Sequence, residues 1–171
     1  MKRGVIFDLD QTLVDSSLAK KYRDKRDWKS VYSLIPQFVL FEGLEEVFEY
    51  ITDHGIKVGI VSNAPSPYVQ KALGHFAIPY DTVVAYHDVI RRKPDPEGMY
   101  LALSELQLTP NDVISLGDDP NDIIASNTAK IDSVACLWGS DNRGSLLSVE
   151  PTYVISTPSE LITFTEVIDI L

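Results

Sequence analysis

The chain has 171 residues, a length that suits one globular domain with a substantial core. Hydrophobic residues make up 44% and charged residues 23%, which excludes a disordered chain, and no apolar run approaches the roughly 18 residues that a membrane span needs. The net charge of −10 argues against general nucleic-acid binding, which requires a basic face.

Six short apolar segments, most of them rich in Val and Ile, predict strands. They lie at 4–7, 56–61, 80–86, 112–116, 133–138 and 152–155. Continuous apolar runs of this length are typical of strands that are buried on both faces of a sheet. Asp8 interrupts the first run, which argues against a signal peptide, and we expect a cytoplasmic protein.

Helical patterns separate these strands. The first is an apolar stripe over 44–51, which Gly55 terminates. Further helices are expected at 67–76, 97–106 and 120–129, and at the C-terminus, where Leu161, Phe164, Ile168 and Leu171 form one stripe. The alternation predicts an α/β fold: a three-layer, Rossmann-like sheet of five to six mostly parallel strands with helices on both faces.

The segment at about 15–42 breaks this alternation. We expect it to form a small helical insert above the sheet, within a single domain that spans 1–171. Between Leu18 and Lys29 it carries two acidic residues and six basic ones, which are Lys20, Lys21, Arg23, Lys25, Arg26 and Lys29. Two interpretations stay open, a solvated helix face or side chains that meet an anionic substrate, with Arg23 and Arg26 as the candidates to test.

Polar side chains follow four of the predicted strands. In chain order they are Asp8, Asp10 and Thr12; Ser62 and Asn63; Lys93; and Asp118 and Asp122. Because open parallel sheets bind ligands beyond the carboxyl ends of their strands, we expect these side chains to lie together at one edge.

This set of side chains suits phosphoryl transfer. Neighbouring carboxylates need a hard cation, and Mg²⁺ prefers oxygen ligands. A lysine and Mg²⁺ together neutralise the charge of a phosphate that a carboxylate attacks. Hydroxyl groups and the amino ends of helices hold the remaining phosphate oxygens.

The four motifs, in this order, resemble those of the haloacid dehalogenase-like (HAD) phosphohydrolases. They are Asp8-Leu9-Asp10-Gln11-Thr12, Ser62 after an apolar strand, Lys93 before a proline, and Gly117-Asp118 with Asp122. Segments 41–44 (FEGL) and 92–96 (RKPDP) are similar to the phosphoglycolate phosphatase-like branch. Gln11 stands where this family most often has Gly, and the insert at about 15–42 is much shorter than the usual cap of that branch.

The resemblance implies a Mg²⁺-dependent phosphatase that hydrolyses a phosphomonoester through an aspartyl-phosphate intermediate. Asp8 would be the nucleophile and Asp10 the general acid and base. The metal ligands would be Asp8, the backbone carbonyl of Asp10, and Asp118. Asp122 would not bind the metal directly but would orient a metal-bound water or Lys93. The implied phosphate-binding residues are Thr12, Ser62, Asn63 and Lys93.

Other functions stay open at this point. A phosphomutase of the same fold normally needs a larger cap than this insert provides. A phosphoacceptor signalling domain carries its acceptor after the third strand, where Asp88 stands, and a phosphate-binding protein would need no catalytic acids. The substrate could be a small phosphorylated metabolite or a larger phosphorylated molecule at an open site, and a second subunit could cover that site.

Overall fold

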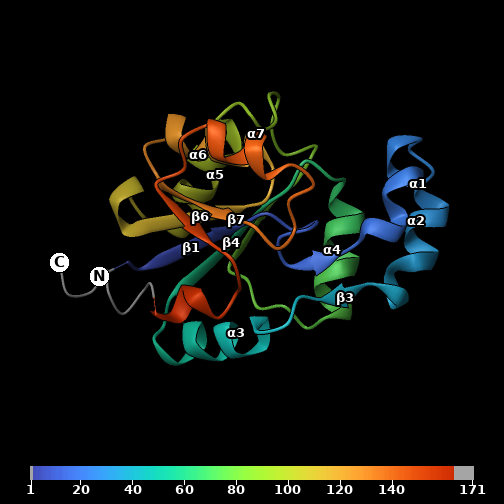
Figure 1. The fold of residues 1–171 in the computed structure, drawn as a ribbon, viewed down its shortest axis with the longest axis horizontal. Coiled ribbons are helices and arrows are strands. Elements are labelled where there is room, and N and C mark those ends of the chain that lie inside the picture. Colours follow the sequence, from blue (N-terminus) through green and yellow to red (C-terminus); the bar gives the residue numbers. More distant parts are fainter. Residues whose placement is uncertain (1, 164–171) are drawn as a thin grey trace.

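A computed structural model describes residues 2–163 of the chain. Its main sheet has the strand order β5-β4-β1-β6-β7-β8, and every neighbouring pair is parallel (Figure 1). The strands are β1 (Gly4–Phe7), β4 (Lys57–Val61), β5 (Thr82–Val84), β6 (Val113–Gly117), β7 (Asp132–Cys136) and β8 (Tyr153–Ile155). All six strands that the apolar segments predict are therefore present, within a few residues of the expected bounds.

The side chains of β1 alternate between two hydrophobic clusters. Val5 and Phe7 pack with α3 (Leu44–Asp53) and α4 (Ser66–His75), while Ile6 packs on the other face. The second cluster includes residues of α5 (Glu97–Leu106) and α6 (Pro120–Thr128). Figure 1 shows α3 on one side of the sheet and α5 and α6 on the opposite side. The predicted three-layer α/β fold is confirmed.

Glycines set both limits of α3. Gly43 precedes the helix with φ +91°, and Gly55 follows it with φ +62°, a backbone conformation that glycine adopts without steric cost. The predicted apolar stripe of α3 is buried, as expected. The bounds of α5 agree with the prediction, and those of α4 and α6 agree within one residue.

The insert consists of short helices beside α4 at one end of the molecule (Figure 1). They are η1 (Ser17–Ala19), α1 (Lys20–Asp24), α2 (Trp28–Leu34) and η2 (Ile35–Gln37). The rings of Trp28 and Tyr68 lie 5.6 Å apart and join α2 to α4. Two short strands that the sequence did not predict, β2 (Val14–Asp15) and β3 (Val39–Leu40), pair antiparallel where the insert leaves and rejoins the domain.

A helix begins at residues 160–163, and Glu160 accepts a hydrogen bond of 3.0 Å from the backbone N–H of Thr157. Phe164, Ile168 and Leu171 of the predicted C-terminal stripe lie outside the described residues. α7 (Arg143–Ser148) was not predicted. Within residues 2–163, no helix has the length and apolar character required to cross a lipid bilayer.

Candidate active site

A cavity of about 670 Å³ opens at the carboxyl edge of the sheet. Residues that follow β1, β4 and β6 line it, among them Asp8, Ser62 and Asp118. The insert supplies another part of its wall, with Lys20, Arg23, Arg26 and Trp28 among the lining residues. The sequence-predicted residues Asp10, Asn63, Lys93 and Asp122 also line it, so most of the expected site lies at one place.

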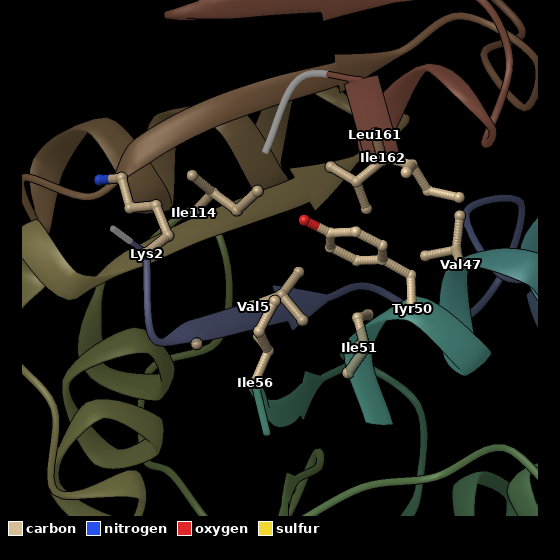
Figure 2. Close-up of a pocket in the computed structure, with 10 residues that line it drawn as sticks. Lys2, Val5, Val47, Tyr50, Ile51, Ile56, Ile114, Leu161 and Ile162 are labelled. Carbon is tan, nitrogen blue, oxygen red and sulfur yellow. The ribbon is translucent and has the colours of Figure 1, made fainter. Parts of the chain in front are cut away.

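A second hollow, at the amino ends of β1 and β6, has a different character. It is a narrow space of about 10 Å³ with largely apolar walls (Figure 2). The ring of Tyr50 lies among Val5, Ile114 and Leu161 there, and Lys2 stands at its margin. Among residues 2–163, those that line this hollow include no carboxylate, in contrast to the cavity at the opposite edge of the sheet.

Asp8 stands at the end of the central strand. Its backbone N–H donates to the carbonyl oxygen of Leu116 at 3.0 Å, which continues the pairing of β1 with β6. Its Oδ1 lies 2.7 Å from the amino nitrogen of Lys93. The strand thus fixes the backbone of Asp8, and the lysine fixes its side chain.

Lys93 is buried among oxygen atoms. Its Nζ lies 2.7 Å from Asp8 Oδ1 and 2.6 Å from Asp122 Oδ1, and donates to the carbonyl oxygen of Val61 at 2.7 Å. Burial opposes the charge of Lys93, but Asp122 and Asp8 outweigh it and raise the pKa of the lysine above its usual range. Lys93 therefore remains a cation in this site.

Asp8, Asp118 and Asp122 form a carboxylate cluster in which one oxygen from each residue lies within 4.8 Å of the others. Burial raises the pKa of Asp8 to about 7, with Asp122 and Asp10 adding to the rise and Lys93 opposing it. Burial, followed by the charges of Asp8 and Asp122, raises the pKa of Asp118 to about 9. One lysine does not neutralise three carboxylates, so the donor set fits a hard divalent cation.

Asp119 and Asp122 also begin α6. Asp119 is the N-cap residue, and its side chain accepts from the backbone N–H of Asn121 at 2.9 Å. Asp122 Oδ2 accepts from the backbone N–H of Asp119 at 3.1 Å, while its Oδ1 faces Lys93. The capping box therefore orients one carboxylate of the cluster, and Asp119 is the acidic residue at the amino end of the helix.

Ser62 and Asn63 continue beyond β4. Ser62 Oγ accepts from the backbone N–H of Ala64 at 3.1 Å, which stabilises the turn. The amide of Asn63 exchanges two hydrogen bonds with the backbone of Lys93, at 3.0 and 3.2 Å. Both residues line the cavity, and Asn63 also holds the segment that delivers Lys93.

Thr12 has a different environment from that of the other predicted phosphate-binding residues. It is fully buried, and its Oγ1 donates to Asp118 Oδ1 at 2.8 Å. Its carbonyl oxygen accepts from the indole N–H of Trp138 at 3.0 Å. The structure thus gives the hydroxyl of Thr12 a contact with Asp118.

The side chain of Asp10 turns toward the insert. Its Oδ1 lies 3.0 Å from Arg23 Nη1 and accepts from Ser16 Oγ and Tyr68 OH, both at 2.5 Å. Burial and the charge of Asp10 raise the pKa of Tyr68 well above its usual value, so the phenol stays a neutral donor. The sequence did not indicate Ser16 or Tyr68, and it left Arg23 either on a solvated helix face or as a contact for an anionic substrate.

Comparison with known proteins identifies the family. The family model described as haloacid dehalogenase-like hydrolase matches residues 18–136. The chain belongs to the haloacid dehalogenase-like hydrolase family. The matched part includes Ser62, Lys93 and Asp118, whereas Asp8 and Asp10 precede it.

Two curated relatives of this haloacid dehalogenase-like chain have specific names. The pyrophosphatase PpaX of Bacillus velezensis is 32% identical over 129 residues, which cover 74% of this chain and 60% of the relative. The phosphoglycolate phosphatase of Salmonella paratyphi A is 29% identical over 125 residues, which cover 72% of this chain and 50% of the relative. The chain thus spans between half and 60% of the length of these relatives, and the predicted resemblance to the phosphoglycolate phosphatase-like branch is confirmed.

A solved structure supports the haloacid dehalogenase-like fold. A predicted phosphoglycolate phosphatase from Haemophilus somnus superposes with a TM-score of 0.85 over 96% of this chain and 98% of that one. The two sequences are 20% identical. The similarity therefore shows a shared fold.

Proposed function

We propose that this chain is a Mg²⁺-dependent phosphatase that hydrolyses a phosphomonoester through an aspartyl-phosphate at Asp8. The observation that carries the proposal is the Asp8–Lys93 pair, 2.7 Å between Oδ1 and Nζ, beside Asp118 and Asp122 at the floor of the cavity. A carboxylate nucleophile must approach a phosphate that repels it. A buried lysine and a metal site beside that nucleophile supply the positive charge required.

The proposed hydrolysis has two half-reactions, and Asp8 and Asp10 act in both. In the first, an oxygen of Asp8 forms a bond to phosphorus while the bond from phosphorus to the leaving oxygen breaks, and Asp10 gives that oxygen a proton. In the second, water attacks the same phosphorus, Asp10 takes a proton from the water, and the bond between phosphorus and Asp8 breaks. The products are the alcohol and inorganic phosphate.

Mg²⁺ held by Asp8, the carbonyl oxygen of Asp10, and Asp118 would neutralise the phosphate oxygens during transfer. Asp122, which contacts Lys93, would hold the lysine in place beside this site. Lys93, Ser62 and Asn63 would bind the phosphate oxygens. We propose that Thr12, through its bond to Asp118, orients a metal ligand, and the phosphate contact first predicted for its hydroxyl stays untested.

We propose a small phosphorylated metabolite as the substrate. The cavity has a volume of about 670 Å³, which suits a small molecule. The insert places Lys20, Arg23 and Arg26 along its wall, above the carboxylates at its floor. The names of the two relatives supply pyrophosphate and phosphoglycolate as the first compounds to assay.

Turnover of p-nitrophenyl phosphate with Mg²⁺, and with EDTA in its place, tests the function. Asp8→Asn should lower kcat by roughly 10³-fold or more, because the covalent route loses its nucleophile. Asp53→Asn, an equal change at an exposed position of α3, is the matched control. Near wild-type turnover in Asp8→Asn would exclude the covalent mechanism, and transfer of phosphate within a substrate without its release would indicate a mutase instead.

A further inference from the structure

Three hydrogen bonds converge on one oxygen of Asp10. Ser16 Oγ, Arg23 Nη1 and Tyr68 OH all donate to Oδ1, at 2.5, 3.0 and 2.5 Å. Within residues 2–163, no hydrogen bond to Oδ2 accompanies them. The carboxylate is therefore held from one side only.

The donors come from three separate parts of the fold and restrain one another. Ser16 precedes η1, Arg23 belongs to α1 of the insert, and Tyr68 belongs to α4. Ser16 and Tyr68 are fully buried. Arg23 Nη1 also donates to the carbonyl oxygen of Ser16 at 3.1 Å and to its Oγ at 2.6 Å. Such a network leaves Oδ1 little freedom to move.

Hydrogen-bond chemistry then distinguishes the two oxygens. A guanidinium group has donors and no acceptor, so the oxygen that faces Arg23 is not the one that carries a proton. Asp10 lines the cavity. Oδ2 is therefore the oxygen available to exchange a proton with a molecule bound there.

We propose that Arg23, with Ser16 and Tyr68, is a positioning residue that fixes Asp10 with Oδ2 toward the substrate. This inference rests on the proposed acid–base role of Asp10. It makes the insert a part of the catalytic geometry, because an arginine of α1 orients an acid that follows β1. A misplaced proton donor slows reaction most when the leaving oxygen is strongly basic.

A second ion pair of α1 provides a comparison, because it joins the insert to the rest of the domain without contacting Asp10. Lys20 and Asp141 lie 2.5 Å apart, but their side chains are 58% and 80% exposed. Arg23 and Asp10 are 16% and 19% exposed. The less exposed pair is thus the one that includes Asp10, the proposed general acid. An experiment can therefore separate a role of Arg23 in positioning Asp10 from a role in attaching the insert.

The test compares kcat/KM for a series of phosphate esters whose leaving groups range from p-nitrophenol to a simple alcohol. Arg23→Gln should lower kcat/KM for the alkyl ester by about 10- to 100-fold, and much less for p-nitrophenyl phosphate. Tyr68→Phe should change the series in the same direction, and Arg23→Lys should restore part of the loss. Lys21→Gln, an exposed residue of α1 outside the cavity, is the equal-charge control.

A double-mutant cycle with Asp10→Asn makes the test decisive. If Arg23 acts through Asp10, adding Arg23→Gln to Asp10→Asn should cost nothing further. A full additional loss in the double variant, or an equal loss across all leaving groups, would overturn the positioning role and leave Arg23 as an attachment. Thermal unfolding checks each variant, and Arg23→Lys and Tyr68→Phe carry the test where Arg23→Gln does not fold.

The outcomes also separate this inference from the proposed function. Wild-type protein without Mg²⁺-dependent turnover, or active Asp8→Asn protein, would overturn both. The positioning role alone would be overturned by a different combination of results. In that case the wild-type protein is active, Asp8→Asn is inactive, and Arg23→Gln shows the same dependence on the leaving group as the wild type.

Discussion

Lys93 places one positive charge among buried carboxylates. Its contacts with Asp8 and Asp122, at 2.7 and 2.6 Å, leave little room for water between the charges. Removing one partner of a buried ion pair costs more than the pair contributes, because the remaining charge has lost both water and partner. The contacts on which the proposed reaction depends therefore also stabilise the fold around the site.

Replacement of Lys93 by Met should lower the free energy of unfolding by about 3–5 kcal/mol at pH 8 in EDTA, and abolish turnover. The loss should be smaller at pH 5, where protonation of Asp8, whose pKa is raised to about 7, removes part of the unpaired negative charge. Urea unfolding at both pH values measures it. Lys29→Met, at an exposed position of α2, should stay within about 0.5 kcal/mol of wild type. Equal stability losses at the two pH values would contradict the explanation.

Gln11 adopts φ +66°, in the left-handed region that disfavours a side chain. The sequence already marked this position, because similar proteins most often have Gly there. The backbone conformation supplies the physical reason. The sequence could therefore locate an unusual turn between Asp10 and Thr12 but could not reveal what holds it.

At the scale of elements, the segment after β7 holds that turn. The indole N–H of Trp138 donates to the carbonyl oxygen of Thr12 at 3.0 Å. Gly139 lies so close that an added Cβ would overlap the carbonyl oxygen of Gln11. Adjacent residues of one segment, far away in the sequence, thus shape the loop that carries Asp10.

Gly139→Ala should displace this loop, because the obstructing atom belongs to the backbone and has no rotamer to change. We expect a loss of about 1–3 kcal/mol in the free energy of unfolding and a fall in kcat/KM. Gly74→Ala is the control, because Gly74 lies within α4 and an added Cβ there would meet no atom within 4 Å. It should be neutral or raise stability by up to about 1 kcal/mol. Matching effects of the two substitutions on activity would exclude the close approach as their cause.

The predictable elements are those with enough residues to show a pattern. α5 and the buried parallel strands produce apolar runs and helical stripes that can be read directly. β2 and β3 have two residues each, too few for alternation, and α7 buries only Leu146 among its six residues. Their formation depends on tertiary contacts, which leave no periodic trace in the sequence.

At the scale of the molecule, strand order explains why the candidate site was largely predictable. Once the sheet is parallel, the residues after β1, β4 and β6 must meet at one edge, and the carboxylate cluster follows. The contact between Arg23 and Asp10 does not follow from strand order. It depends on how the insert packs against α4, through rings such as Trp28 and Tyr68, and the sequence alone does not specify that packing.

The carboxylate cluster should link stability to both pH and Mg²⁺. The pKa of Asp8 is raised from 3.8 to about 7 and that of Asp118 from 3.8 to about 9. In the metal-free protein the folded state therefore binds more protons than the unfolded chain over this interval, so its stability should fall as pH rises from about 4 to 9. Mg²⁺ competes with those protons and should raise Tm more at pH 8 than at pH 6.

Thermal unfolding at both pH values, with EDTA or with excess Mg²⁺, measures this linkage without any substrate. Asp118→Asn should remove most of the Mg²⁺-dependent rise in Tm and flatten its dependence on pH. An equal rise at pH 6 and pH 8 would show that the cation does not compete with protons at these carboxylates.

The central position of β1 has a consequence for the order of assembly during synthesis. Gly4 pairs with Lys57 on one side and with Val113 on the other, so the first strand of the chain waits for partners made much later. Asp8 leaves the ribosome before Lys93 and Asp118 have been translated. Asp8 is thus translated before the other members of the carboxylate cluster, and the cluster can form only after the chain has grown past α6.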